Sequence, residues 1–192
     1  MMQGSRLMSE TETFIELIRD SKEDEAMQML DASPELATAH TERKGQLHGA
    51  SPLHWAAHRN AVRLCRRLLE LGADVNDSDS HWWLTPLSWG ADAGCAAAVE
   101  LLLESGADVN QDAVVGNTAL HAAAMGGSTC GSGDPPAYRR TAEVLIAYGA
   151  DINRISHGRT RQTPLDAAIE YGNIHVADVL RRHGAITVDP AG

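Results

Sequence analysis

The amino-acid sequence predicts an all-α fold, a solenoid of about four similar helix pairs that follow a degenerate helical pair at the N-terminus. Two observations predict it. A short phrase of the type Thr-Pro-Leu-His occurs four times, and a Gly-Ala element follows each copy, 21 residues after its start in three copies and 31 in the third. The phrases begin at Ser51, Thr85, Thr118 and Thr163, and the glycines are Gly72, Gly106, Gly149 and Gly184. Such repetition is typical of stacked units that bury each other's apolar faces.

Each phrase predicts the start of a first helix. A serine or threonine hydroxyl caps the helix, and a proline fits the first helical position because its missing N–H would have no partner there. In the first copy, Leu53, Ala56 and Ala57 then lie at helical spacing. These small apolar residues allow neighbouring helices to approach closely, so we expect them in the core.

A second amphipathic helix follows in every unit, because apolar residues recur three and four positions apart. These helices are expected within residues 62–69, 97–103, 141–146 and 176–180. The glycine after each segment suits the left-handed residue that ends a helix. The next residues predict a hairpin-like connection to the following unit, here called a finger. The first to fourth fingers are residues 39–50, 73–84, 107–117 and 150–162.

The N-terminal part lacks the phrase but keeps helical spacing of apolar residues over residues 14–30, with a turn at 20–22. Its many carboxylates give the polar outer face that a terminal unit needs. We therefore expect a capping pair of helices. The predicted organisation is a flexible N-terminus (1–12), one repeat domain (13–188) with a cap (13–46) and repeats of about 47–80, 81–113, 114–158 and 159–188, and a tail (189–192).

The phrase, the Gly-Ala element and a period of about 33 residues resemble ankyrin repeats over about residues 13–188. The resemblance implies an ankyrin-repeat α-solenoid with short β-hairpin fingers. It also implies a non-enzymatic module that binds a partner protein through the concave face, formed by the fingers and the inner helices. His54 and His121 occupy the position whose ring usually links neighbouring fingers in this family.

The composition favours a protein partner over nucleic acid, because the net charge is −10 and nucleic-acid affinity depends on clustered lysine and arginine. No apolar run approaches the length of a membrane span, and the first eight residues lack an apolar signal core. Three scattered cysteines form neither a disulfide framework nor a metal-binding pair. We expect a monomer in the cytoplasm.

Neither catalysis nor a cofactor is expected. The sequence has no nucleophile motif, phosphate-binding glycine loop or two-histidine metal helix. Nine histidines are present, but they do not form a set of three or four metal ligands. Asp74, Asp108 and Asp151 recur with the repeat, which is typical of turn chemistry rather than of an active site.

The four tryptophans all lie between residues 55 and 89 and depart from the repeated pattern. By the resemblance, the residue after the phrase histidine and those at the helix end face the concave groove. Exposed aromatic residues and arginine dominate protein interfaces. The predicted partner-binding residues are Trp55, His58, Arg59, His81, Trp82, Trp83, Trp89, Asp92, Met125, Arg159 and Tyr171.

Two other interpretations of the tryptophans remain open at this point. Trp82 or Trp83 could tuck under its own finger while Trp55 and Trp89 stack across the repeat interface. Alternatively, the aromatic rings could form a cage for a cationic small molecule or modified peptide, with Asp79 or Asp92 supplying the negative charge. A small array without a second domain would also suit a regulator or inhibitor.

The third unit carries ten extra residues between its helices. Residues 125–137 are rich in glycine, serine and proline, which predicts a loop. This loop is either a tolerated surface insertion or a binding loop. Cys130 within it is expected to be exposed and inert.

Overall fold

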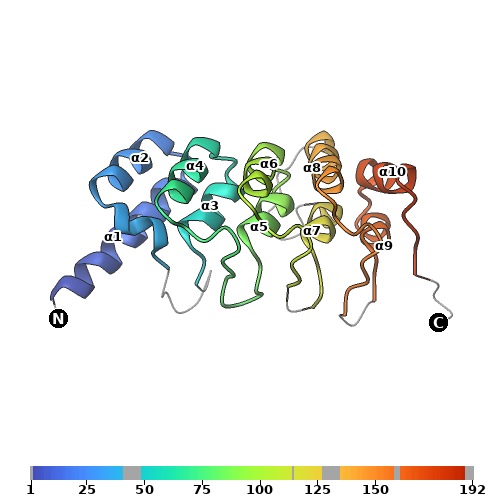
Figure 1. The fold of residues 1–192 in the computed structure, drawn as a ribbon, viewed down its shortest axis with the longest axis horizontal. Coiled ribbons are helices and arrows are strands. Elements are labelled where there is room, and N and C mark those ends of the chain that lie inside the picture. Colours follow the sequence, from blue (N-terminus) through green and yellow to red (C-terminus); the bar gives the residue numbers. More distant parts are fainter. Residues whose placement is uncertain (1, 41–48, 114, 127–134, 158–160, 189–192) are drawn as a thin grey trace.

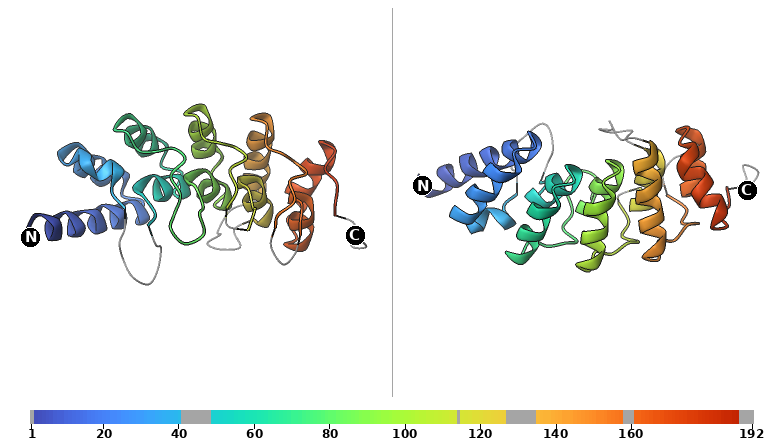
Figure 2. Two further views of the ribbon diagram at one scale, coloured as in Figure 1. Left: turned by 60° about the horizontal axis from the view of Figure 1, so that its bottom comes forward. Right: turned by 90° about the horizontal axis from the view of Figure 1, so that it is seen from above.

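The computed structural model describes residues 2–40, 49–113, 115–126, 135–157 and 161–188. Helix pairs stand side by side in one row from the N-terminus to the C-terminus (Figure 1), and both further views keep this order (Figure 2). The inner helices are α1 (Met2–Arg19), α3 (Pro52–His58), α5 (Pro86–Asp92), α7 (Ala119–Met125) and α9 (Pro164–Glu170). The outer helices are α2 (Glu23–Ala32), α4 (Val62–Glu70), α6 (Ala96–Glu104), α8 (Pro135–Ala147) and α10 (Ile174–Arg182), and a 3-10 helix, η1 (Pro34–Thr38), follows α2.

The repeated phrase starts each inner helix from α3 onward, as predicted. Thr85 and Thr163 cap α5 and α9, where their hydroxyls accept from the N–H groups of Ser88 and Asp166 at 3.2 Å. In α3, the N–H of Ser51 donates to Nδ1 of His54 at 3.1 Å. The phrase therefore satisfies backbone donors that the first turn of a helix leaves without partners.

The core lies between the inner and outer layers. Each repeat contributes a leucine from its inner helix and one from its outer helix, and all are buried: Leu53, Leu87, Leu120 and Leu165 inside, and Leu68, Leu102, Leu145 and Leu180 outside. Burial of one such side chain stabilises the fold by about 1.5–3 kcal/mol. Small residues set the distance between units, because a Cβ added to Gly90 would lie 3.2 Å from Val99 and 3.6 Å from Ala57.

The glycines that follow the outer helices have the left-handed conformation that the sequence predicts. Gly72 and Gly106 have φ angles of +91° and +92°, a left-handed conformation that side chains other than glycine rarely adopt. The following N–H groups turn back onto the helix, as when Ala73 donates to the carbonyl of Leu68 at 3.0 Å.

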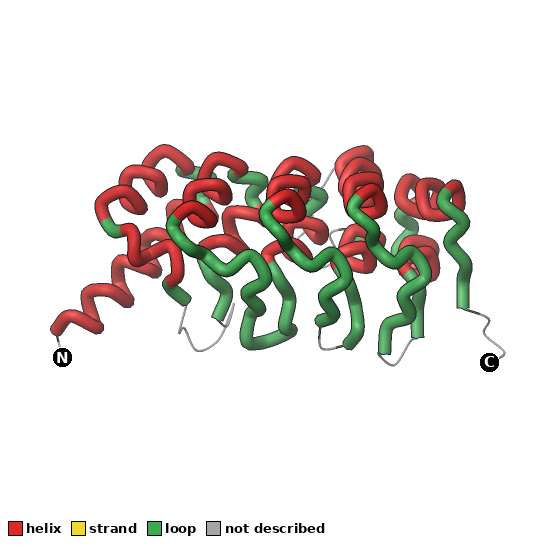
Figure 3. Tube along the Cα trace, in the orientation of Figure 1, coloured by secondary structure: helices red, strands yellow, loops and turns green. Residues whose placement is uncertain are grey.

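The fingers project together from one side of the row (Figure 3), but the expected β-hairpins are wrong for the described residues, which contain no strand. A strand pair needs a ladder of backbone bonds. In the second finger, the Asp79 N–H donates to the Leu84 carbonyl at 3.0 Å and the Trp83 N–H donates to the Asp79 carbonyl at 3.2 Å. In the fourth finger, the Ser156 N–H donates to the Gln162 carbonyl at 2.9 Å.

Asparagine side chains, rather than paired strands, join successive fingers. Asn76 accepts from the N–H of Asp108 at 2.8 Å, and Asn110 accepts from that of Asp151 at 2.8 Å. Asn153 continues the series with the N–H of Ile186 at 2.9 Å. We call this series the asparagine ladder. The repeated aspartates support it locally: Asp74 accepts from the N–H of Asn76 at 2.9 Å, which is the predicted turn chemistry.

Two boundaries differ from the prediction. Helix α1 begins at Met2, so residues 2–12, expected to be flexible, continue the first helix of the cap. No proline interrupts them, and buried Thr11 extends the helical spacing of Phe14 and Ile18. Helix α8 begins at Pro135, so the last residues of the predicted loop form its first turn. The rest of that loop from residue 127, Cys130 included, lies outside the described residues, as does the tail.

Candidate partner-binding face

The second finger carries two exposed indoles at its tip. Trp82 is 55% exposed and Trp83 is 62% exposed. The rings of His81 and Trp82 pack edge to face with centroids 4.7 Å apart. Neither tryptophan tucks under the finger, so this part of the chain presents a large apolar surface to solvent. We call residues 79–84 the tryptophan finger.

Asp79 holds the tryptophan finger from inside. Its side chain is buried, with 4% exposed. One carboxylate oxygen accepts from the N–H groups of His81 at 3.1 Å and Trp82 at 2.7 Å. The other accepts from the indole N–H of Trp89 on α5 at 3.0 Å. One carboxylate therefore fixes the finger to the inner helix layer.

From the sequence, Asp79 is expected only as a counter-charge for a bound cation. Its partners in the structure are the backbone of the finger and the indole of Trp89, ten positions further along the chain. An aspartate at the start of a turn is a known signal for side-chain bonds to the backbone two or three residues later. That signal could have identified half of its role, but the bond to Trp89 depends on the fold.

Trp83 adopts an unfavourable backbone conformation. Its φ angle is +58°, a left-handed value that costs a side-chain-bearing residue about 1–2 kcal/mol. Its N–H donates to the carbonyl of Asp79 at 3.2 Å, which keeps the turn closed. A glycine would relieve the strain, and loss of the exposed ring would remove little buried surface. Backbone strain of this kind clusters at functional sites.

Replacing Trp83 with glycine is expected to raise the free energy of unfolding by about 0.5–1 kcal/mol, because relief of the left-handed strain exceeds the extra chain entropy of glycine. Urea denaturation measures the change. Ser21 has a φ angle of +59° and is the matched control, so Ser21→Gly should give a similar gain. A clear loss of stability in Trp83→Gly alone would instead assign the ring to the packing of the fold.

The tryptophans of the inner helices form a packed cluster. Trp55 and Trp89 meet edge to face with ring centroids 4.9 Å apart, and His58 lies 6.4 Å and 6.1 Å from them. The guanidinium of Arg19 covers Trp55 at 5.1 Å. The expected open aromatic platform is wrong for Trp55, because this side chain is only 6% exposed and belongs to the core. The two rings pack across the repeat interface, which was the alternative interpretation.

The histidines near this cluster are neutral structural groups. Nδ1 of His54 accepts from Ser51, so its proton lies on Nε2, which donates to the Leu84 carbonyl of the second finger at 3.0 Å. Burial lowers the pKa of His54. His121 likewise bonds the Gln162 carbonyl at 3.1 Å, and burial lowers its pKa. These bonds link an inner helix to the following finger, whereas the resemblance implies a link between neighbouring fingers. Burial, followed by the charge of Arg59, lowers the pKa of His58.

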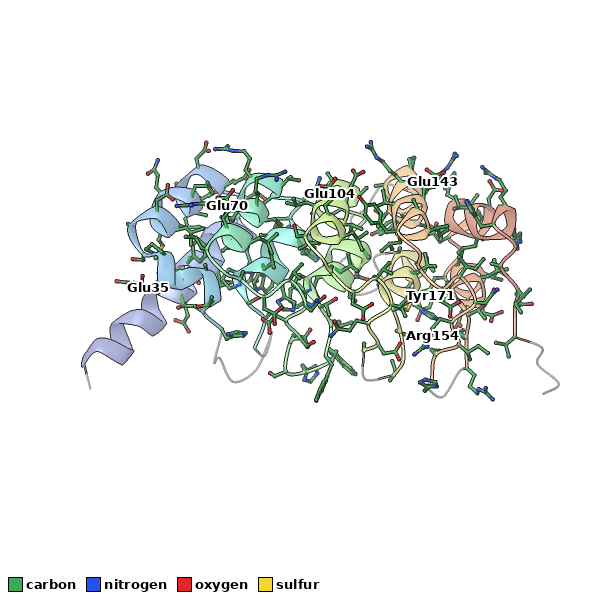
Figure 4. The ribbon with its side chains drawn as sticks, viewed as in Figure 1. Glu35, Glu70, Glu104, Glu143, Arg154 and Tyr171 are labelled. Carbon is green, nitrogen blue, oxygen red and sulfur yellow. The ribbon has the colours of Figure 1, made fainter. Side chains whose placement is uncertain are left out.

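The other predicted residues lie in a row along the ends of successive inner helices rather than in one cluster. Arg59 is exposed after α3, Asp92 and Met125 are half-buried at the ends of α5 and α7, and Tyr171 is 51% exposed after α9. Arg159 lies outside the described residues. Figure 4 shows Tyr171 and Arg154 on the side of the fingers, whereas Glu70, Glu104 and Glu143 lie in the outer layer.

Contacts that the sequence did not reveal join the second, third and fourth fingers into one surface, here called the ledge. Gln111 donates to the Ser78 hydroxyl at 3.2 Å, and an ion pair joins Arg154 to Asp112. The N–H of His157 donates to the carbonyl of Val115 at 2.7 Å. The tryptophan finger is therefore supported on the side of its C-terminal neighbours.

A family model described as ankyrin repeats (3 copies) matches residues 20–113 and 87–190, which together span the array from the end of α1 onward. The chain belongs to the ankyrin repeat family. A search of the curated proteins finds no match. Ankyrin repeats are generally protein–protein interaction modules.

In the described ranges, no three histidine, cysteine or acidic side chains gather as metal ligands, and no helix is both long and apolar enough to cross a membrane. Burial raises the pKa of Cys65 to about 12 and that of Cys95 to about 11, so both stay protonated at neutral pH.

An enclosed cage for a cation is not supported by the geometry of these ankyrin repeats. Trp55 and Trp89 turn edge to face, and Trp55 is buried while Trp89 is partly buried. Both oxygens of Asp79 already accept hydrogen bonds. The exposed indoles are those of Trp82 and Trp83, on the fingertip.

Proposed function

We propose that this ankyrin array binds a partner protein through its fingers and inner helices, with Trp82 and Trp83 as the central contact. The observation that carries the proposal is the exposure of two adjacent indoles, 55% and 62%, on a finger fixed by Asp79. Large exposed apolar surface is characteristic of interaction sites, and tryptophan is enriched among the residues that dominate binding.

The rigid finger supports this proposal energetically. Binding costs conformational entropy for every side chain and loop that must become ordered. The bonds of Asp79 order the finger before a partner arrives, so more of the contact energy remains as affinity. A module of this kind acts by covering part of its partner, and we therefore propose a regulatory or inhibitory role rather than catalysis.

Affinity capture from native cytosol tests the proposal. The bait is the full chain, compared with a Trp82→Ala/Trp83→Ala double variant. Both rings are exposed, so the fold should survive, and far-UV circular dichroism checks this. We expect at least one stoichiometric partner that the double variant fails to retain.

A matched control separates the fingertip from general apolar exposure. Ile174 is 70% exposed on α10, and Ile174→Ala should retain the partner. If the double variant captures the same proteins as the unchanged chain, Trp82 and Trp83 are not the contact.

A further inference from the structure

We infer that the segment seated on the tryptophan finger is basic and places arginine or lysine side chains against the faces of Trp82 and Trp83. This inference rests on the proposed function and specifies the chemistry of the partner. It follows from two independent features, the exposure of the two indoles and the distribution of charge along the chain.

The open rings suit a cation. Indole is the aromatic side chain that attracts cations most strongly, and arginine also stacks on its face. The chain already contains one such pair, since the guanidinium carbon of Arg19 lies 5.1 Å from the centroid of Trp55. Trp82 and Trp83 offer the same kind of ring with more than half of each side chain accessible.

The excess negative charge of the chain lies in the stretch of sequence that contains this finger. Between residues 68 and 138 there is no lysine or arginine, whereas the same stretch holds ten carboxylates, which equals the whole net charge of −10. They are Glu70, Asp74, Asp77, Asp79, Asp92, Glu100, Glu104, Asp108, Asp112 and Asp134. The remainder of the chain is balanced, with sixteen acidic and sixteen basic residues.

Several of these carboxylates flank the tryptophan finger along the ledge. Asp74 and Asp108 are exposed at the bases of the second and third fingers. Each uses one oxygen to accept from an asparagine N–H, at 2.9 Å in both cases. Arg154 reaches this region from the fourth finger and is paired with Asp112. The resulting negative field attracts basic segments and repels nucleic acid, whose bases would otherwise stack on exposed indoles.

A titration with synthetic peptides tests the inference on the full chain. The probe is a blocked peptide that alternates arginine and glycine, followed through the indole N–H signals in ¹H–¹⁵N spectra. We expect saturable shifts of the Trp82 and Trp83 signals. A peptide with citrulline, which keeps the planar shape but lacks the charge, should bind about tenfold more weakly. Added salt should weaken the arginine peptide.

Matched variants assign the two features separately. Trp82→Ala/Trp83→Ala should abolish binding of the arginine peptide, and Ile174→Ala should leave it unchanged. Asp74→Asn/Asp108→Asn keeps the oxygen acceptors for Asn76 and Asn110 but removes two charges, so binding should weaken several-fold without loss of the fold. Equal binding of the citrulline peptide, or tighter binding of a single-stranded oligonucleotide, would overturn the inference.

The two proposals fail in different ways. If the double tryptophan variant loses its captured partner while the arginine peptide does not bind, the protein-binding proposal stands and the basic partner is wrong. If the double variant loses neither partner nor peptide, the fingertip is not a binding site, and both proposals fail.

Discussion

Replacing Asp79 with alanine is expected to lower the free energy of unfolding by about 3 kcal/mol and to release the tryptophan finger. The change leaves three donors without their acceptor: the N–H groups of His81 and Trp82 and the indole N–H of Trp89. A buried donor without a partner costs about 1–3 kcal/mol, and water at the exposed tip recovers part of this cost. Urea denaturation at neutral pH measures the loss.

Two further variants define the role of Asp79. Asp74→Ala removes an exposed carboxylate that serves one N–H group, so it should cost less than about 1 kcal/mol. Asp79→Asn keeps the shape but replaces one acceptor oxygen by a donor, so it should fall between the two alanine variants. The exposure of Trp82 and Trp83 to acrylamide should change only in the Asp79 variants. An Asp79→Ala protein as stable as the unchanged chain would show that these bonds do not hold the finger.

Acidification from neutral pH to about pH 5 is expected to destabilise the array. Burial lowers the pKa of His54 and of His121 below the ordinary value of 6.5. The unfolded chain therefore takes up protons as the pH falls through 6.5, whereas the folded protein does not. Stability falls from that point until the pH reaches the lowered folded pKa. Each histidine contributes at most about 1.4 kcal/mol per pH unit in this window.

Urea denaturation at a series of pH values measures this dependence. His54→Gln and His121→Gln should each be less stable at neutral pH, because the ring bonds to the finger are lost, but should show a shallower dependence on pH. His175 is exposed on α10, and His175→Gln serves as the control with an unchanged slope. Equal slopes in all four proteins would assign the acid sensitivity to other groups.

The helices could be predicted from the sequence because their causes are local. The hydroxyl of Thr85, the proline after it and the left-handed Gly106 act within a few residues of their own positions. The fingers were predicted less well. Their extended shape is local. A β-hairpin requires a ladder of backbone bonds within one finger, whereas the side chain of Asn76 bonds to the backbone of the next finger.

The site was predicted only in part, for the same reason. The motif position of Trp55 suggests an exposed ring, but Arg19 from the cap and Trp89 from the next repeat cover it. Trp82 and Trp83 are exposed because they lie at the tip of a finger, beyond the packed helix layers. Only the local half of the role of Asp79 could be assigned from the sequence, because its second oxygen meets a ring on the following helix.

The asparagine ladder also sets the spacing of the array. Asn76, Asn110 and Asn153 each bridge two units with a single side chain, so the separation of neighbouring fingers equals the reach of an asparagine. Asn76 and Asn110 also donate to the carbonyls of Gly106 at 3.4 Å and Gly149 at 3.2 Å. Glutamine is one methylene longer and aspartate cannot make this donation, so neither residue reproduces this separation. The length of the asparagine side chain therefore fixes the interval between neighbouring fingers. A ligand that touches several fingers meets them at these intervals, which the helix side chains alone would not define.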